Sequence, residues 1–216
     1  MLMKILLAPV GEQTKPIYEG FKHIKDVNRV YLLASDKTLK YAEEISARLS
    51  EVYEIEIITI EADNLDDIIE KITEKISKHN CYKNIISNIT GGTKIMSLAC
   101  YIVTSFYSGD AFYLFKDTGE YVDAPILKVN LKNVLSYNST RFKILKCIQN
   151  TQKNLTEIAK TINIKNSTLN RHITILSEHN LVKNQRFGRE VLIEITKTGK
   201  LFYNLVLLHE KRRKIL

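Results

Sequence analysis

A short segment with the chemistry of an anion-binding turn follows an apolar, β-branched run at residues 84–89. It consists of Thr90-Gly91-Gly92-Thr93-Lys94, and a long apolar segment of helical composition comes directly after it. Adjacent glycines let a backbone turn tightly and approach a ligand closely. The start of a helix adds unpaired N–H groups and the positive end of the helix dipole. With the Thr93 hydroxyl and the Lys94 charge, the segment predicts a phosphate-binding turn.

A second group of residues that could bind a polyanion lies in the last third of the chain. Residues 166–176 show helical spacing, with Leu169, Ile173 and Leu176 on the core side. The other side carries small polar or cationic groups suited to base edges and phosphates. These candidate DNA-binding residues are Asn166, Ser167, Thr168, Asn170, Arg171 and Thr174. Arg186 and Arg189, on either side of Gly188 in a predicted turn, complete the set.

Strand-like and helix-like patterns alternate through the first part of the chain. The predicted strands are residues 3–8, 29–34, 53–60 and 84–89, and the predicted helices are residues 15–23, 37–49 and 64–79. Asp36 and Asn64 stand where helix N-caps are expected. Residues 110–115 and 126–131, on either side of a turn at 116–123, predict an edge hairpin. The alternation predicts an α/β fold with a Rossmann-like, doubly wound, mainly parallel sheet.

Loops at the carboxyl ends of such strands form the ligand crevice of a doubly wound sheet. Three segments leave predicted strands there: residues 9–14, 35–36 and 90–94. The dinucleotide fingerprint G-x-G-x-x-G is absent after the first strand, and the P-loop pattern occurs nowhere. An ordinary NAD enzyme or NTPase is therefore disfavoured.

The helix predicted after Lys94 is apolar on nearly every side. Its residues Ile95, Met96, Leu98, Ala99, Ile102, Val103 and Phe106 leave almost no polar face. Since a helix that is apolar all round is buried all round, one face covers the sheet and the other needs a second partner. A neighbouring helix of the same chain is one candidate, and a two-fold homodimer interface is the favoured one.

The chain after residue 136 has the pattern of a winged helix-turn-helix domain. Residues 141–148, 154–162 and 166–176 read as three helices, and residues 181–196 read as a hairpin with a basic tip. The sequence at residues 155–182 resembles the DNA-binding domains of ArsR- and MarR-type regulators, and this resemblance covers residues 139–196. We therefore expect two domains, residues 1–135 and 136–216, with a further helix from about residue 197 and a basic tail at 211–214.

Charge supports the division into two parts. Residues 1–136 carry 16 Lys and Arg against 19 Asp and Glu, whereas residues 137–216 carry 16 against 5. A basic part joined to an acidic part is typical of nucleic-acid or membrane contact. No stretch approaches the roughly 18–20 apolar residues that span a bilayer. Cys81, Cys100 and Cys147 lack metal-ligand spacing, so we expect reduced thiols, no metal and a cytoplasmic protein.

The element order, the Val10–Pro16 loop and the Thr90–Lys94 turn resemble a CARF domain, the CRISPR-associated Rossmann-fold sensor. The resemblance covers about residues 1–131. It implies a homodimer whose pocket binds cyclic oligoadenylate, with cyclic tetra-adenylate expected, and no further cofactor. Thr90, Gly91, Gly92, Thr93 and Lys94 would hold phosphates and ribose. Gly11, Gln13, Thr14 and Ser35 would lie near the bases or the opposite side of the ring.

Three functions remain open from the sequence. The leading hypothesis is a CRISPR-associated transcriptional regulator in antiviral defence, with double-stranded DNA as partner. The second is a ring nuclease, since some CARF proteins cleave their ligand and Lys94 could stabilise the developing charge. Glu12 is the nearest candidate base and no catalytic residue is assigned, so anion binding without chemistry is favoured. The third is a winged-helix regulator of a different anionic ligand.

Overall fold

The computed structural model describes residues 3–78, 84–115, 117–126, 134–187 and 190–213. The chain divides into two compact units, Met1–Val129 and Asn130–Leu216. We refer to them as unit 1 and unit 2 and describe each by itself.

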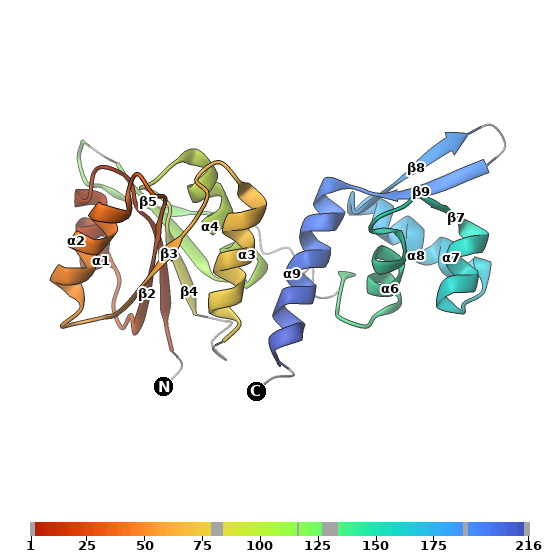
Figure 1. The fold of residues 1–216 in the computed structure, drawn as a ribbon, viewed down its shortest axis with the longest axis horizontal. Helices are drawn as coiled ribbons and strands as arrows, with labels where there is room; N and C mark the ends of the chain where they lie inside the picture. The colour runs from red at the N-terminus through yellow and green to blue at the C-terminus, as the bar shows by residue number, and fades with distance from the viewer. Residues whose placement is uncertain (1–2, 79–83, 116, 127–133, 188–189, 214–216) are drawn as a thin grey trace. The chain divides into compact units, whose positions relative to one another are not determined.

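Unit 1 is a six-stranded sheet with helices on both faces, which confirms the predicted α/β fold (Figure 1). The strands are β1 (Ile5–Pro9), β2 (Arg29–Ala34), β3 (Glu54–Thr59), β4 (Ile85–Asn88), β5 (Asp110–Leu114) and β6 (Tyr121–Ala124). Their order is β3-β2-β1-β4-β5-β6, and only β6 is antiparallel to its neighbour. The strand order reverses between β1 and β4, so the switch point lies there.

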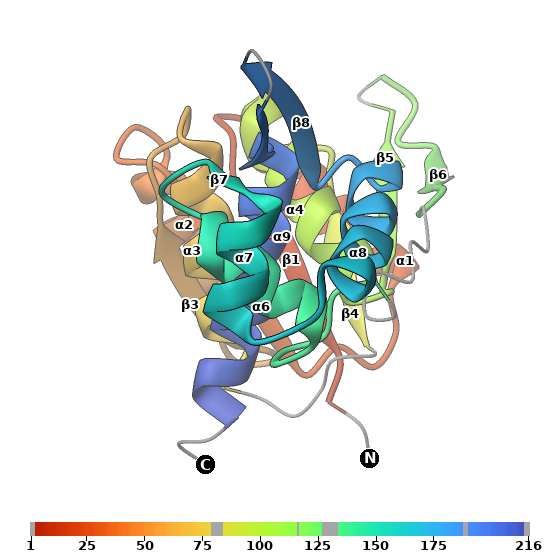
Figure 2. The ribbon, with the colours of Figure 1, turned by 90° about the vertical axis from the view of Figure 1, so that its right-hand side faces the viewer.

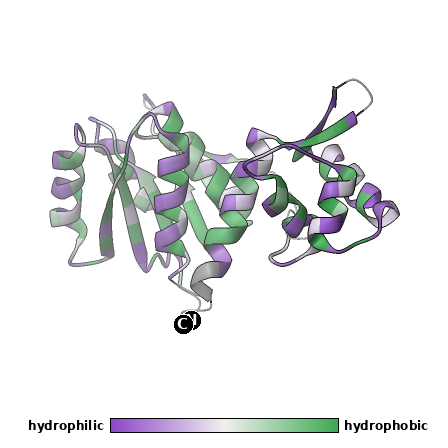
Figure 3. Ribbon diagram, turned by 45° about the vertical axis from the view of Figure 1, so that its right-hand side comes forward, coloured by the Kyte–Doolittle hydropathy of each residue, from purple (hydrophilic) through white to green (hydrophobic). Residues whose placement is uncertain are grey.

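Four helices cover the sheet of unit 1. They are α1 (Lys15–His23), α2 (Leu39–Leu49), α3 (Leu65–Ile76) and α4 (Lys94–Phe106). Figure 1 shows α1 and α2 on one face and α3 and α4 on the other. All five residues of β1 are buried, as a parallel strand covered on both faces requires. Figure 3 shows the hydrophobic residues concentrated in the strands and in the inner helix faces.

Two details of unit 1 differ from the sequence prediction. The partner of β5 is Tyr121–Ala124, which begins inside the predicted turn at 116–123 and ends just after it. The hairpin closes earlier than predicted because the Phe115 N–H bonds the Glu120 carbonyl at 3.0 Å. Of the predicted strand at 126–131, residue 126 is not in a strand and 127–131 lie outside the described residues. The N-cap of α2 is Thr38 rather than Asp36, because residues 35–38 form a turn closed by Thr38 N–H and the Ser35 carbonyl at 2.9 Å.

Unit 2 has the winged helix-turn-helix arrangement that the sequence predicts (Figure 2). The elements are α6 (Thr140–Ile148), β7 (Lys153–Asn154), α7 (Leu155–Ile162), α8 (Asn166–Glu178), β8 (Val182–Phe187), β9 (Glu190–Ile195) and α9 (Lys197–Arg213). The strands form a small antiparallel sheet in the order β7-β9-β8. Asn163 ends α7 with a left-handed backbone (φ +55°), so α8 begins only three residues later.

The core of unit 2 joins its helices through aromatic and aliphatic side chains. Phe142 of α6 stacks on Tyr203 of α9 with ring centroids 4.8 Å apart, and Leu145 and Leu205 are fully buried. The predicted additional helix is therefore present as α9 and contributes to this core. Among the described residues, no helix combines the length and apolar character that crossing a bilayer requires.

The start of α7 offers a test of this local structure. Asn154 forms a capping box, in which its side chain accepts from the Glu157 N–H at 2.9 Å and its own N–H bonds the Glu157 carboxylate at 3.0 Å. We expect Asn154→Ala to destabilise unit 2 by about 1 kcal/mol, measured by thermal unfolding monitored by circular dichroism. Asn204→Ala, at an exposed position within α9, is the control and should not lower the midpoint. Equal midpoints for both variants would contradict the capping role.

Candidate functional sites

The turn at residues 90–94 packs directly against the loop that follows β1. A β carbon on Gly91 would lie 2.4 Å from the Pro9 carbonyl oxygen, and one on Gly11 would lie 3.1 Å from the Gly92 nitrogen. Gly92 also has a φ of +71°, which L side chains rarely adopt. The structure therefore brings the two predicted loops together at the switch point, and the glycines are what permits this approach.

Two cavities both have Gly11 and Gly92 in their walls. The smaller, about 250 Å³, is lined by Gly11, Glu12, Gln13, Pro16, Thr90, Gly91 and Gly92. The larger, about 790 Å³, is lined by Val10, Gly11, Glu12, Ser35, Asp36, Lys37, Thr38, Thr59, Ile60, Glu61, Ala62, Asp63, Lys71, Gly92, Thr93 and Met96. Glu12 reaches both cavities. Seven of the nine predicted ligand residues line one cavity or both, whereas Thr14 and Lys94 line neither.

The two threonine hydroxyls of the turn are already bonded within the protein. The Thr90 hydroxyl oxygen accepts from the Leu114 N–H at 2.8 Å, and Thr90 is buried. The Thr93 hydroxyl donates to the Ala62 carbonyl oxygen at 3.0 Å and accepts from the Met96 N–H at 3.2 Å. Each hydroxyl has a single proton, so Thr93 has no donor left for a phosphate. The structure thus gives these hydroxyls a framework role.

The donors that remain at this turn belong to the backbone. Within the described residues, the N–H groups of Gly91, Gly92, Lys94 and Ile95 have no hydrogen-bond partner. Lys94 is exposed and adds an ammonium group at the first position of α4. Unpaired N–H groups at the start of a helix, beside a cation, form an anion-binding arrangement.

The wall of the larger cavity contains residues that the sequence analysis missed. They are residues 60–63, which follow β3, and residues 37–38, which extend the predicted segment 35–36 after β2. The alternation of strands and helices could have predicted the segment after β3. Because β3 is parallel to β2, its carboxyl end lies at the same edge of the sheet as that of β2. The segment after β3 belongs to this edge for the same reason as the segments after β1, β2 and β4.

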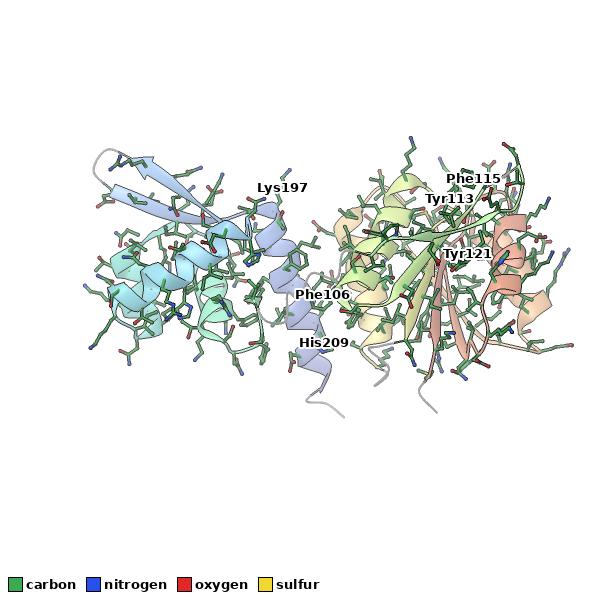
Figure 4. The ribbon with its side chains drawn as sticks, turned by 180° about the vertical axis from the view of Figure 1, so that it is seen from behind. Phe106, Tyr113, Phe115, Tyr121, Lys197 and His209 are labelled. Carbon is green, nitrogen blue, oxygen red and sulfur yellow. The ribbon has the colours of Figure 1, made fainter. Side chains whose placement is uncertain are left out.

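A second face of α4 is apolar and only partly covered. Met96, Ala99, Cys100 and Val103 are buried against unit 1, whereas Leu98 is 44% exposed and Ile95 and Ile102 are half-buried. At the neighbouring sheet edge Phe115 is 50% exposed, and its ring meets that of Tyr113 edge-on (Figure 4). The Tyr101 hydroxyl bonds the Pro125 carbonyl at 2.7 Å and links α4 to the segment after β6. Leu98, Ile95 and Ile102 thus give α4 a partly uncovered apolar face.

In unit 2 the predicted polar face of α8 is open. Leu169, Ile173 and Leu176 are buried, as predicted, and the six candidate DNA-binding residues of this helix are all exposed. The Thr174 hydroxyl donates to the Asn170 carbonyl at 3.0 Å, which reduces its capacity to donate elsewhere. Arg186 is exposed on β8, and Arg189 lies outside the described residues.

Burial shifts the pKa values of His172 and Cys100 towards their neutral forms. The pKa of His172 is lowered by burial and by the charges of Arg141 and Arg171, which favours the neutral ring on α8. Burial raises the pKa of the Cys100 thiol, so it stays protonated. In the described part of the chain, His, Cys, Asp and Glu side chains nowhere gather in threes as metal ligands.

Comparison with solved structures finds distant similarities. Can2 from Sulfobacillus thermosulfidooxidans, solved in complex with cyclic tetra-adenylate, aligns with 99% of this chain at 15% identity and a TM-score of 0.45, and the chain spans 64% of its length. The homodimeric winged helix-turn-helix domain of Mb0332 from Mycobacterium bovis aligns with 39% of this chain and 78% of its own at 19% identity and a TM-score of 0.36.

Sequence comparison identifies the family. An uncharacterized protein of Archaeoglobus fulgidus is 22% identical over 191 residues, covering 82% of this chain and 85% of its own. Residues 138–185 match a helix-turn-helix domain family. Residues 5–126, more than half of the chain, match the Card1 CARF domain family. The CARF resemblance is therefore confirmed: this chain belongs to the Card1 CARF domain family, with a helix-turn-helix domain following the CARF domain.

Proposed function

We propose that this chain is a cytoplasmic, homodimeric transcriptional regulator that binds cyclic oligoadenylate through unit 1 and DNA through unit 2. One observation carries the proposal: a turn with free backbone N–H groups in a CARF domain and an exposed polar helix face in a helix-turn-helix domain occur on the same chain. A sensor of a messenger that controls transcription requires both.

The donors around the turn suit a phosphodiester ring. The backbone N–H groups of Gly91 and Gly92 and the ammonium group of Lys94 would bind phosphate oxygens, and Gln13 would approach from the other wall of the smaller cavity. The apolar face of α4 supports pairing with a second copy, because a partner on this face would cover Leu98, which unit 1 leaves exposed, and Ile102, which it leaves half-buried. Two such turns would then face one ring.

DNA binding follows from the charge and the exposed face of unit 2. Residues 137–216 have 16 basic against 5 acidic residues, so phosphate contacts should make binding strongly salt-dependent. In a dimer, two α8 helices reach successive major grooves only at one spacing. Ligand bound to the CARF domains would change DNA affinity by changing that spacing, and DNA would change ligand affinity by the same factor.

The decisive experiment is a titration of DNA from the gene's own upstream region at two salt concentrations, with and without cyclic tetra-adenylate. We expect binding that weakens steeply with salt and an affinity that the ligand changes severalfold in either direction. Recovery of intact ligand afterwards supports a sensor, whereas rapid conversion to a linear product would identify an enzyme instead. An affinity unaffected by ligand would contradict the proposed coupling.

Arg171→Ala tests the DNA interface. Removing an exposed guanidinium from α8 should weaken DNA binding by about 1–3 kcal/mol, while calorimetry shows unchanged affinity for cyclic tetra-adenylate. Arg48→Ala removes an arginine of α2 that pairs with Glu44 and serves as the control. If Arg171→Ala bound DNA as tightly as the control at moderate salt, α8 would not be the reading helix.

Lys94→Ala tests the ligand site in the opposite direction. Loss of one charge-assisted contact should lower affinity for cyclic tetra-adenylate by about tenfold, measured by calorimetry, with DNA affinity in the absence of ligand unchanged. Lys40→Ala, at an exposed lysine of α2 outside the turn at residues 90–94, is the matched control. Similar ligand affinities for the two variants would remove Lys94 from the site.

We expect the Thr93 hydroxyl to stabilise the fold by joining the start of α4 to the loop after β3. Thr93→Ser keeps a hydroxyl for Ala62 and Met96, so its stability and ligand affinity should match the parent protein. Thr93→Val loses both bonds, so its free energy of unfolding should fall by about 1 kcal/mol or more and the amides of residues 60–64 should exchange faster. Unchanged exchange in Thr93→Val would show that the hydroxyl does not hold this loop.

A further inference from the structure

The larger cavity has a charge pattern that is unfavourable for phosphate. Four carboxylates line it, those of Glu12, Asp36, Glu61 and Asp63. Two ammonium groups oppose them, and one of these, Lys71, already pairs with Asp67 at 2.9 Å. An anionic group would therefore meet net negative charge, whereas a neutral group with hydrogen-bond donors would meet free acceptors. The two cavities thus favour different parts of one ligand.

Among the side chains of this wall, Asp36 and Lys37 are best placed to form hydrogen bonds with a neutral group. Both are exposed and line the cavity, and within the described residues neither has a hydrogen bond or ion pair. Their turn is fixed, because the Ser35 N–H donates to the Thr38 hydroxyl oxygen at 3.1 Å. The Glu61 carboxylate, by contrast, already accepts from the Asn64 amide at 2.9 Å.

We propose that the larger cavity holds a nucleobase of the ring and that Asp36 determines its identity by accepting a hydrogen bond from the exocyclic amino group. Lys37 donates to a ring nitrogen beside that group. Adenine has an amino donor beside a ring-nitrogen acceptor, which matches Asp36 and Lys37. Hypoxanthine has the reverse order, a carbonyl acceptor beside an N–H donor. A cavity of about 790 Å³ has room for a base and its ribose. The inference rests on the proposed function and deepens it, since it assigns a specificity residue to the same site.

The test compares two synthetic rings, cyclic tetra-adenylate and cyclic tetra-inosinate, by calorimetric titration of the full chain. The parent protein should prefer the adenylate ring by about tenfold or more. Asp36→Ala should lower affinity for the adenylate ring by about tenfold and change affinity for the inosinate ring by less than about threefold. Asp36→Asn should reduce the ratio of adenylate-ring affinity to inosinate-ring affinity, because the amide can rotate to donate or to accept a hydrogen bond.

Glu43→Ala is the control, because it removes an exposed carboxylate of α2 that lines neither cavity and should leave both affinities unchanged. Equal changes for both rings in Asp36→Ala would overturn the inference, since they would indicate general electrostatics or misfolding. An Asp36→Ala variant with the parent preference would also overturn it while leaving the proposed function intact. Failure of the parent protein to bind either ring would instead contradict the proposed function, and the inference with it.

Discussion

The close approach of two backbone segments at the switch point is the constraint on which the rest of unit 1 depends. Any side chain on Gly91 would collide with the Pro9 carbonyl, because a β carbon would lie only 2.4 Å from that oxygen. The contact fixes the first turn of α4 against the loop after β1, and both cavities have Gly11 and Gly92 in their walls. Backbone donors held in a fixed turn need no side-chain ordering when a ligand binds, which lowers the free-energy cost of binding.

At this turn, threonine side chains hold the protein framework, and backbone N–H groups are left as free donors. Thr90 ties the end of β4 to β5, and Thr93 ties the start of α4 to the loop after β3. The Thr93 hydroxyl thereby uses its one proton within the protein, and the Thr90 hydroxyl oxygen is occupied as an acceptor. The glycine N–H groups remain for an anion. A motif that suggests five ligand-binding residues thus contains a framework of two threonines around a backbone site.

The distribution of charge separates the two proposed binding events. Residues 1–136 are slightly acidic and residues 137–216 strongly basic, so DNA, if bound as we propose, would be attracted to unit 2. An anionic ring approaching unit 1 receives no help from net charge and depends on local donors. In the proposed function, Lys94 and the free N–H groups would supply that local attraction, and the acidic wall of the larger cavity would meet the neutral part of the ligand.

The sequence by itself determined the fold class, the family and the two-part organisation. Hydrophobic periodicity and local capping signals are properties of neighbouring residues, which is why α3, α7 and the buried side of α8 were predicted correctly. The edge strand β6 was misplaced, because strand pairing depends on the turn that closes it rather than on the strand's own composition. Only the tertiary structure decided which polar groups are free. Whether the Thr93 hydroxyl meets a ligand or Ala62, and whether Asp36 caps a helix or lines a cavity, depends on contacts between segments distant in sequence, and no local pattern encodes those distances.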